Sequence, residues 1–143
     1  MGPLKLKERY GDWALVTGGH SGIGYCLSEQ LAAEGLNVII AARGKAALEE
    51  AKANITAKHQ VEVRIVVADI SSKAGVDGLI EAVKDLEIGI LVNNAAVEAK
   101  GFFGEQSPEK IEYALPARRL THFACHPCAP SHRPSPQRSI YYH

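Results

Sequence analysis

The sequence has few cysteines and no long apolar run. Its three cysteines, in a chain of 143 residues, are too few and too unevenly spaced for a disulfide framework. No apolar run approaches the roughly 18 residues of a membrane-spanning helix, and the N-terminal segment is charged, unlike a secretory signal. With 46% hydrophobic and 22% charged residues, we expect a globular cytoplasmic protein with no membrane or nucleic-acid partner.

Acidic residues are absent from Leu115 to His143, although the chain as a whole has 16 and a net charge of zero. That segment also holds five of the seven prolines, which remove backbone donors and interrupt helices and central strands. No period of 3.6 or 2 residues is visible in it. We therefore predict a lead-in over residues 1–12, a folded domain over 13–114 and an irregular tail over 115–143.

Residues 13–114 alternate between short apolar runs and stretches with apolar residues at helical spacing. Continuous β-branched runs are typical of strands buried on both faces of a parallel sheet. Strands are predicted at 13–17, 37–42, 61–68 and 88–92, and helices at 20–34, 45–58, 73–86 and from Ser107. This order predicts right-handed crossovers and ligands at the carboxyl ends of the strands. The expected fold is the N-terminal half of a Rossmann-type, three-layer α/β/α domain, with about four strands.

Four glycines follow the first predicted strand: Gly18 and Gly19 precede the helix predicted at 20–34, and Gly22 and Gly24 lie at its start. Glycine here allows a tight turn and close approach of the backbone to a pyrophosphate, and the helix N-terminus supplies N–H donors. The alternative is purely structural, a tight strand-to-helix turn with no ligand. The place of the turn, after the first strand of a repeated βα pattern, favours a nucleotide cofactor.

Three motifs, in order along the chain, resemble those of the short-chain dehydrogenase/reductase family. TGGHSGIG, from Thr17 to Gly24, is similar to the fingerprint TGxxxGxG. ADIS, which contains Asp69, looks like the family's adenine-contacting aspartate, and NNAA, from Asn93 to Ala96, looks like NNAG with alanine in the last place. The resemblance covers about Tyr10 to Ala114 and is strongest to the branch of general oxidoreductases, 3-oxoacyl-CoA reductases and hydroxysteroid reductases.

The resemblance implies that Gly18, Gly22 and Gly24 form a turn around the cofactor phosphates. It also implies that Ser21 and Ile23 contact the pyrophosphate or the nicotinamide side. The residues of this turn that we assign to the cofactor are Thr17, Gly18, His20, Ser21, Gly22, Ile23 and Gly24.

At the other strand ends, the resemblance implies that Asp69 and Ile70 meet the adenine, and that Asn94, Ala95 and Ala96 line its ribose. The asparagines have an equal structural alternative, since their side chains can tie adjacent strands together by hydrogen bonds. The methyl group of Ala96, where the family has glycine, is expected to weaken cofactor binding without excluding it.

The end of the second predicted strand indicates which dinucleotide binds. An acidic residue there would accept hydrogen bonds from the ribose 2′-hydroxyl and select NAD, but AARGK has Arg43 and no acid before Glu49. A guanidinium matches a 2′-phosphate in charge and geometry, so NADP is predicted over NAD, with His20 as a weaker phosphate neighbour. The alternative is that Arg43 is a solvated loop charge.

The resemblance implies hydride transfer between a nicotinamide and a carbonyl or alcohol, with a tyrosine as general acid, a lysine four residues later and a serine. None of the five tyrosines has that lysine, so no catalytic residue is assigned. The full-length form is predicted to be an NADP-dependent oxidoreductase acting on a small molecule. A catalytically inactive nucleotide-binding module is the alternative.

The segment beyond Leu115 departs from the family's pattern, and its composition suggests a reading-frame change or retained intron sequence. Another interpretation is a zinc-binding or interaction segment, formed by Cys125 and Cys128 with His122, His126 and His132. No metal site is assigned, because zinc sites usually bring two spaced ligand pairs from an ordered fold. Without a fifth strand, residues 88–92 would form an apolar edge capable of self-association.

Overall fold

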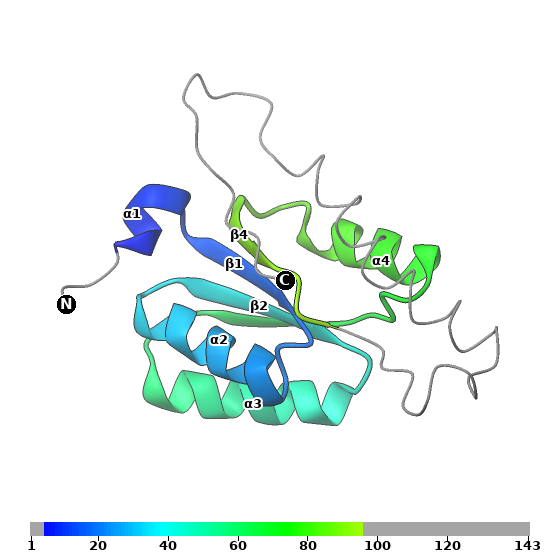
Figure 1. The fold of residues 1–143 in the computed structure, drawn as a ribbon, viewed down its shortest axis with the longest axis horizontal. Coiled ribbons are helices and arrows are strands. Elements are labelled where there is room, and N and C mark those ends of the chain that lie inside the picture. The colour runs from blue at the N-terminus through cyan, green and yellow to red at the C-terminus, as the bar shows by residue number, and fades with distance from the viewer. Residues whose placement is uncertain (1–4, 96–143) are drawn as a thin grey trace, which may run out of the picture.

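The computed structural model describes residues 5–95, and Figure 1 shows their arrangement. Strands and helices alternate as the sequence predicts. In chain order the elements are α1 (Leu6–Tyr10), β1 (Trp13–Thr17), α2 (Gly22–Ala33), β2 (Asn37–Ala42), α3 (Lys45–Lys58), β3 (Val63–Val67), α4 (Lys73–Val83) and β4 (Ile88–Val92). The helix predicted from Ser107 and the segment 115–143 lie outside the described residues, so the predicted domain boundary near Leu115 stays a prediction.

The four strands form one sheet in the order β3-β2-β1-β4, and every pairing is parallel. Helices α2 and α3 cover one face, whereas α4, which leads from β3 across to β4, covers the other (Figure 1). Right-handed crossovers explain the two faces, because the chain moves in one direction from β1 to β3 and then returns past β1. The predicted three-layer α/β/α Rossmann-type fold is confirmed.

The hydrophobic core has two parts, one on each face of the sheet. Ala14 and Val16 of β1 belong to the part beneath α2 and α3, whereas Trp13 and Leu15 belong to the part beneath α4. All five residues of β1 are buried, as are the four central residues of β2. Both faces of these strands are covered, which accounts for their continuous apolar sequences.

Several element bounds differ from the prediction by two or three residues. Helix α2 begins at Gly22 rather than His20, because Gly18 and Gly22 have φ values of 67° and 54° and the turn continues to Ser21. Strand β3 begins at Val63 rather than Val61. Helix α4 ends at Val83 rather than Leu86, because the Leu86 N–H turns back to the Val83 carbonyl at 3.0 Å.

The predicted lead-in contains a short helix, α1, that the sequence analysis did not anticipate. It is followed by Gly11, whose φ of 105° favours glycine. Beside it, the pairing of β1 with β4 shifts register, so that Trp13 lies opposite Ile88 but Ala14 lies opposite Ile90. The residue left over is Gly89, and a Cβ there would collide with the carbonyl group of Tyr10. The absence of a side chain at Gly89 thus lets the end of α1 lie against β4.

Candidate functional site: the carboxyl edge of the sheet

The carboxyl ends of the four strands meet at one edge of the sheet, where α2 also begins (Figure 1). Strand β1 leads directly into the glycine turn, residues 18–21. The Gly18 N–H donates to the Ala41 carbonyl at 2.7 Å, which continues the β1–β2 ladder one residue past the strand. This bond fixes where the turn leaves the sheet.

One part of this edge is closely packed. A Cβ on Gly24 would collide with the Gly18 carbonyl oxygen and the Asn94 side-chain amide, and a Cβ on Gly18 would lie 3.0 Å from Asn94 Nδ2. Only glycine therefore allows the start of α2 to lie so close to the end of β1. We call Thr17, Gly18, Gly24 and Asn94 the packed half of the edge.

The hydroxyl of Thr17 links β1 to the segment that follows β4. Thr17 is fully buried, and its Oγ1 donates to the Val92 carbonyl at 3.4 Å. The same oxygen accepts from the backbone N–H groups of Asn94 and Ala95, both at 3.1 Å. Asn94 Nδ2 in turn donates to the Thr17 carbonyl at 3.1 Å. Asn94 thus ties strand ends together, as its structural alternative predicts.

A buried serine beneath the glycine turn was missed by the sequence analysis. Ser28 of α2 is fully buried, and its Oγ donates to the Gly24 carbonyl at 2.8 Å. A Cβ on Gly19 would lie 2.8 Å from Ser28 Oγ and 2.6 Å from Ile40 Cγ2. Gly19 therefore makes room for a hydroxyl and an isoleucine. The only signal in the sequence is one polar residue on the apolar face of a predicted helix.

The other part of the edge is exposed. Gly22 has a φ of 54°, and a Cβ there would meet nothing within 4 Å. Ile23 is 74% exposed, and the Ser21 side chain makes no capping hydrogen bond to α2. Because the first N–H groups of a helix have no intrahelical acceptor, the start of α2 can donate to a ligand. We call Ser21, Gly22, Ile23, Arg43 and Asp69 the open half of the edge.

Asp69 lies just beyond β3 and is held by a neighbouring serine. Its Oδ1 accepts from the Ser71 hydroxyl at 2.6 Å and from the Ser71 N–H at 3.0 Å. These two bonds, with a smaller contribution from the positive charge of Arg43, lower the pKa of Asp69 below its usual 3.8. Asp69 is therefore a carboxylate at neutral pH. The adjacent Ile70, for which an adenine contact was predicted, is buried in the core beneath α4.

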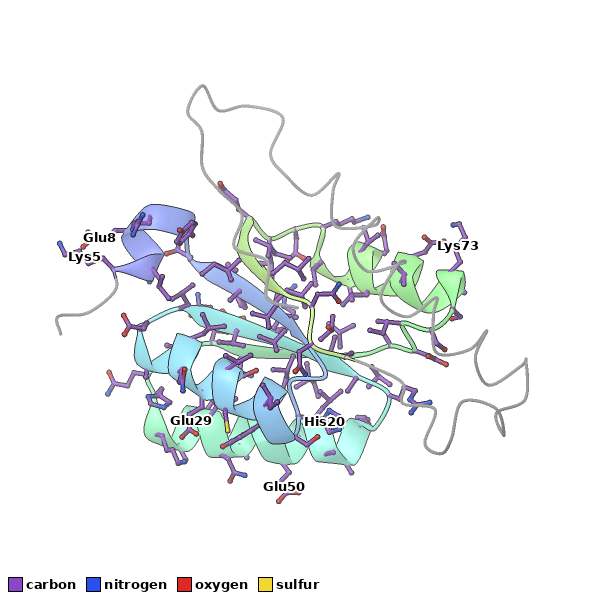
Figure 2. All side chains as sticks on the ribbon, viewed as in Figure 1. Lys5, Glu8, His20, Glu29, Glu50 and Lys73 are labelled. Atoms are coloured by element: carbon purple, nitrogen blue, oxygen red, sulfur yellow. The ribbon has the colours of Figure 1, made fainter. Side chains whose placement is uncertain are left out.

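The remaining predicted residues lie at or beside the same edge. Arg43 is exposed and directly follows β2. His20 lies by the start of α2 (Figure 2) and is half-buried, and its Nδ1 is buried without a hydrogen-bond partner. Val67, at the end of β3, is 53% exposed and was not predicted as a site residue. Ala96 and the cysteines and histidines of the tail lie outside the described residues.

Within residues 5–95, no cluster of three or more histidine, cysteine or acidic side chains could hold a metal ion. In the same range, no helix is long and apolar enough to cross a membrane. The carboxyl edge combines a helix N-terminus, a cation and exposed apolar side chains, which is chemistry suited to a ligand site.

This edge fits a dinucleotide. A pyrophosphate needs amide donors that it can approach closely, and Gly22 leaves that space open at the start of α2. The exposed side chain of Ile23 is a further group that a partly apolar ligand could cover. Fold and site together define a Rossmann-type dinucleotide-binding domain.

Comparison with known proteins defines the family more closely. The family model for short-chain dehydrogenases matches residues 12–120. The chain is 41% identical over 98 residues to hydroxysteroid dehydrogenase-like protein 1 of Gallus gallus, covering 68% of this chain and 30% of that protein. It is 43% identical over 109 residues to the inactive hydroxysteroid dehydrogenase-like protein 1 of Homo sapiens, covering 74% and 33% respectively.

A solved structure shares the fold. It is L-sorbose reductase from Gluconobacter frateurii, complexed with NADPH and L-sorbose, with a TM-score of 0.75 and 30% identity. The match covers 82% of this chain and 47% of that one. The chain belongs to the short-chain dehydrogenase family and contains its NAD(P)-binding region. It spans about a third of the length of the curated relatives it matches.

Proposed function

We propose that the carboxyl edge binds the adenosine diphosphate part of NADP(H), with the pyrophosphate over the N–H groups that begin α2. One observation carries this proposal: Gly22 has a positive φ and open space where a Cβ would lie, directly at the N-terminus of a helix of 12 residues. A phosphate held there accepts backbone hydrogen bonds and lies at the positive end of the helix dipole.

The open half supplies the other contacts in this proposal. Arg43 meets the 2′-phosphate, with His20 as a second neighbour, and Ser21 and Ile23 contact the pyrophosphate or the nicotinamide side. Exposed apolar groups next to a polar edge are typical of ligand sites, and Val67 is well placed to cover part of the adenine. A relative of the same fold binds NADPH, which supports NADP(H) over NAD(H).

For the whole protein we propose an oxidoreductase that transfers hydride between this cofactor and a carbonyl or an alcohol. The bound nicotinamide would supply the hydride chemistry, while the described residues bind and orient its adenosine end. Family membership supports this activity, and we propose the cytoplasm as its compartment.

A second candidate is a nucleotide-binding module without turnover. Relatives from two primates are named inactive hydroxysteroid dehydrogenase-like protein 1. Consumption of NADPH, followed at 340 nm with a panel of ketones, separates the candidates, because only the oxidoreductase oxidises the cofactor.

The cofactor site itself is tested by thermal unfolding of the purified chain. We expect NADPH to raise the melting temperature at a lower concentration than NADH. At equal concentration, both dinucleotides should raise it more than sulfate or pyrophosphate does. Equal stabilisation by all four would contradict the proposal, since it would indicate a general anion effect.

We also propose that the chain self-associates through β4. Among the described residues β4 pairs only with β1, and its side chains are half-buried except Val92. Residues Ile88 to Val92 include no charged residue and no proline, the residue types that prevent an edge strand from pairing with another chain. Light scattering should show a dimer or larger species that Leu91→Lys reduces to the monomer; a monomeric parent chain would contradict the proposal.

A further inference from the structure

Arg43 and Asp69 are neighbours across two paired strands. In the register of the sheet, Ala42 at the end of β2 lies opposite Val67 at the end of β3. One residue further on, the Ala68 N–H donates to the Ala42 carbonyl at 2.9 Å. The sheet pairing therefore continues up to the residues that immediately precede Arg43 and Asp69, and it brings a cation and an anion to the same corner of the open half.

The carboxylate at this corner is fixed in place. Both hydrogen bonds from Ser71 end on Asp69 Oδ1, and the Asp69 carbonyl accepts from the Ser72 hydroxyl at 3.1 Å. Arg43 is close enough for its charge to contribute to the lowered pKa of Asp69. Since both groups are charged at neutral pH and exposed, each changes the potential that an incoming phosphate meets.

We propose that Asp69 determines coenzyme specificity: its carboxylate competes with the 2′-phosphate of NADP(H) for Arg43, and so limits the preference for NADP(H) over NAD(H). This inference rests on the proposed cofactor site. The 2′-phosphate carries negative charge to a corner where a carboxylate is already held near Arg43, the main group assigned to neutralise it. NAD(H) brings a neutral hydroxyl to the same place and is not subject to this competition.

The test is Asp69→Asn, which removes the charge but keeps an oxygen that can accept from Ser71. The measured quantity is the ratio of the dissociation constants of NADH and NADPH, from fluorescence titration. Because adenine is common to both, any contact of residue 69 with the base cancels in this ratio. We expect the ratio to rise about fivefold at low ionic strength. In about 0.5 M salt the rise should fall below about twofold.

A second background tests whether the effect passes through Arg43. In Arg43→Gln, the further change Asp69→Asn should alter the ratio by less than about twofold, since the cation that is competed for is gone. Asp69→Ala should reproduce the rise seen with Asp69→Asn if charge is the cause. The matched control is Asp85→Asn, which removes a carboxylate that pairs with Arg64 at 2.9 Å beyond α4, and it should leave the ratio unchanged.

The outcomes separate this inference from the cofactor site. If the parent chain binds both dinucleotides but Asp69→Asn leaves the ratio unchanged or lowers it, the proposed competition by Asp69 is wrong. The proposed cofactor site is not contradicted by that result. An equal rise in the Arg43→Gln background would also overturn it. If neither dinucleotide binds more tightly than pyrophosphate, the proposed site and this inference both fail.

Discussion

In the packed half of the carboxyl edge, Gly24 lies against the Gly18 carbonyl and the Asn94 amide, whereas in the open half a side chain on Gly22 would meet nothing within 4 Å. The two glycines are two positions apart in one motif. One lets a helix approach a strand, and the other leaves open space at the start of that helix. Substitutions at this edge should therefore separate folding from cofactor binding. The four below run from the largest expected effect on the free energy of unfolding to the smallest.

Gly24→Ala should destabilise the fold most. Its Cβ would collide with backbone atoms of Gly18, which cannot rotate away, and we expect a loss of about 3 kcal/mol in the free energy of unfolding. Urea denaturation measures this loss. The control is Gly78→Ala in α4, where nothing lies within 4 Å and alanine should stabilise the helix by about 0.5–1 kcal/mol. Equal effects of the two substitutions would contradict the close packing.

Thr17→Val should cost about 2 kcal/mol, because the N–H groups of Asn94 and Ala95 lose their acceptor while the side-chain shape is kept. Thr17→Ser retains the hydroxyl and should recover most of the loss. Thr56→Val is the control: Thr56 is exposed and its hydroxyl donates to carbonyls of its own helix, so its removal should change stability by less than about 0.5 kcal/mol. A small loss at Thr17 would show that the packed half does not depend on this hydroxyl.

In contrast to Gly24→Ala and Thr17→Val, Gly22→Ala should have a modest effect on folding and a large effect on cofactor binding. The positive φ of 54° costs an alanine about 1 kcal/mol, but its methyl group would enter the space proposed for the pyrophosphate. We expect at least about tenfold weaker NADPH binding, equal to 1.4 kcal/mol or more. Gly35→Ala, at a φ of 85° with nothing within 4 Å, imposes similar strain after α2 and should leave binding unchanged. Unchanged binding in Gly22→Ala would contradict the site.

Arg43→Gln should leave the unfolding free energy within about 0.5 kcal/mol of the parent, because the side chain is exposed. NADPH affinity should fall about tenfold, which corresponds to one charge-assisted contact, and NADH affinity should not change. Lys45→Gln, which removes an exposed cation paired with Glu49 at 3.7 Å, is the control. Equal weakening of both dinucleotides in Arg43→Gln would contradict a 2′-phosphate contact.

The sheet and its layers could be predicted from the sequence because apolar side chains of β1 and β2 face core on both sides. That burial requires continuous apolar runs such as Trp13–Thr17, which can be recognised directly in the sequence. Family motifs then located the carboxyl edge. The start of α2 was placed two residues early, because the left-handed conformation of Gly22 has no signature beyond the glycine itself.

Other features of the site depend on contacts between residues distant in the chain. Ser28 gives no motif, since its role comes from Gly19 and Gly24 packing against it. The exposure of Val67 could not be predicted from its place in an apolar strand, because exposure depends on which other residues pack over the side chain. The side chain of Ile70 packs beneath α4, which depends on contacts that the motif does not reveal, and its predicted adenine contact stays a prediction. The closeness of Arg43 and Asp69 likewise follows from strand register.

The contact between Tyr10 and Gly89 has a practical consequence for spectroscopy. It holds α1 at the amino end of β1, and the five residues of β1 separate this end from the opposite edge, where we propose that the cofactor binds, by about 16 Å. A fluorophore attached at Glu8, on an exposed face of α1, would therefore lie clear of a bound nucleotide yet within energy-transfer range of a reduced nicotinamide. Energy transfer between the two ends of β1 would therefore measure how much of the protein has bound the cofactor.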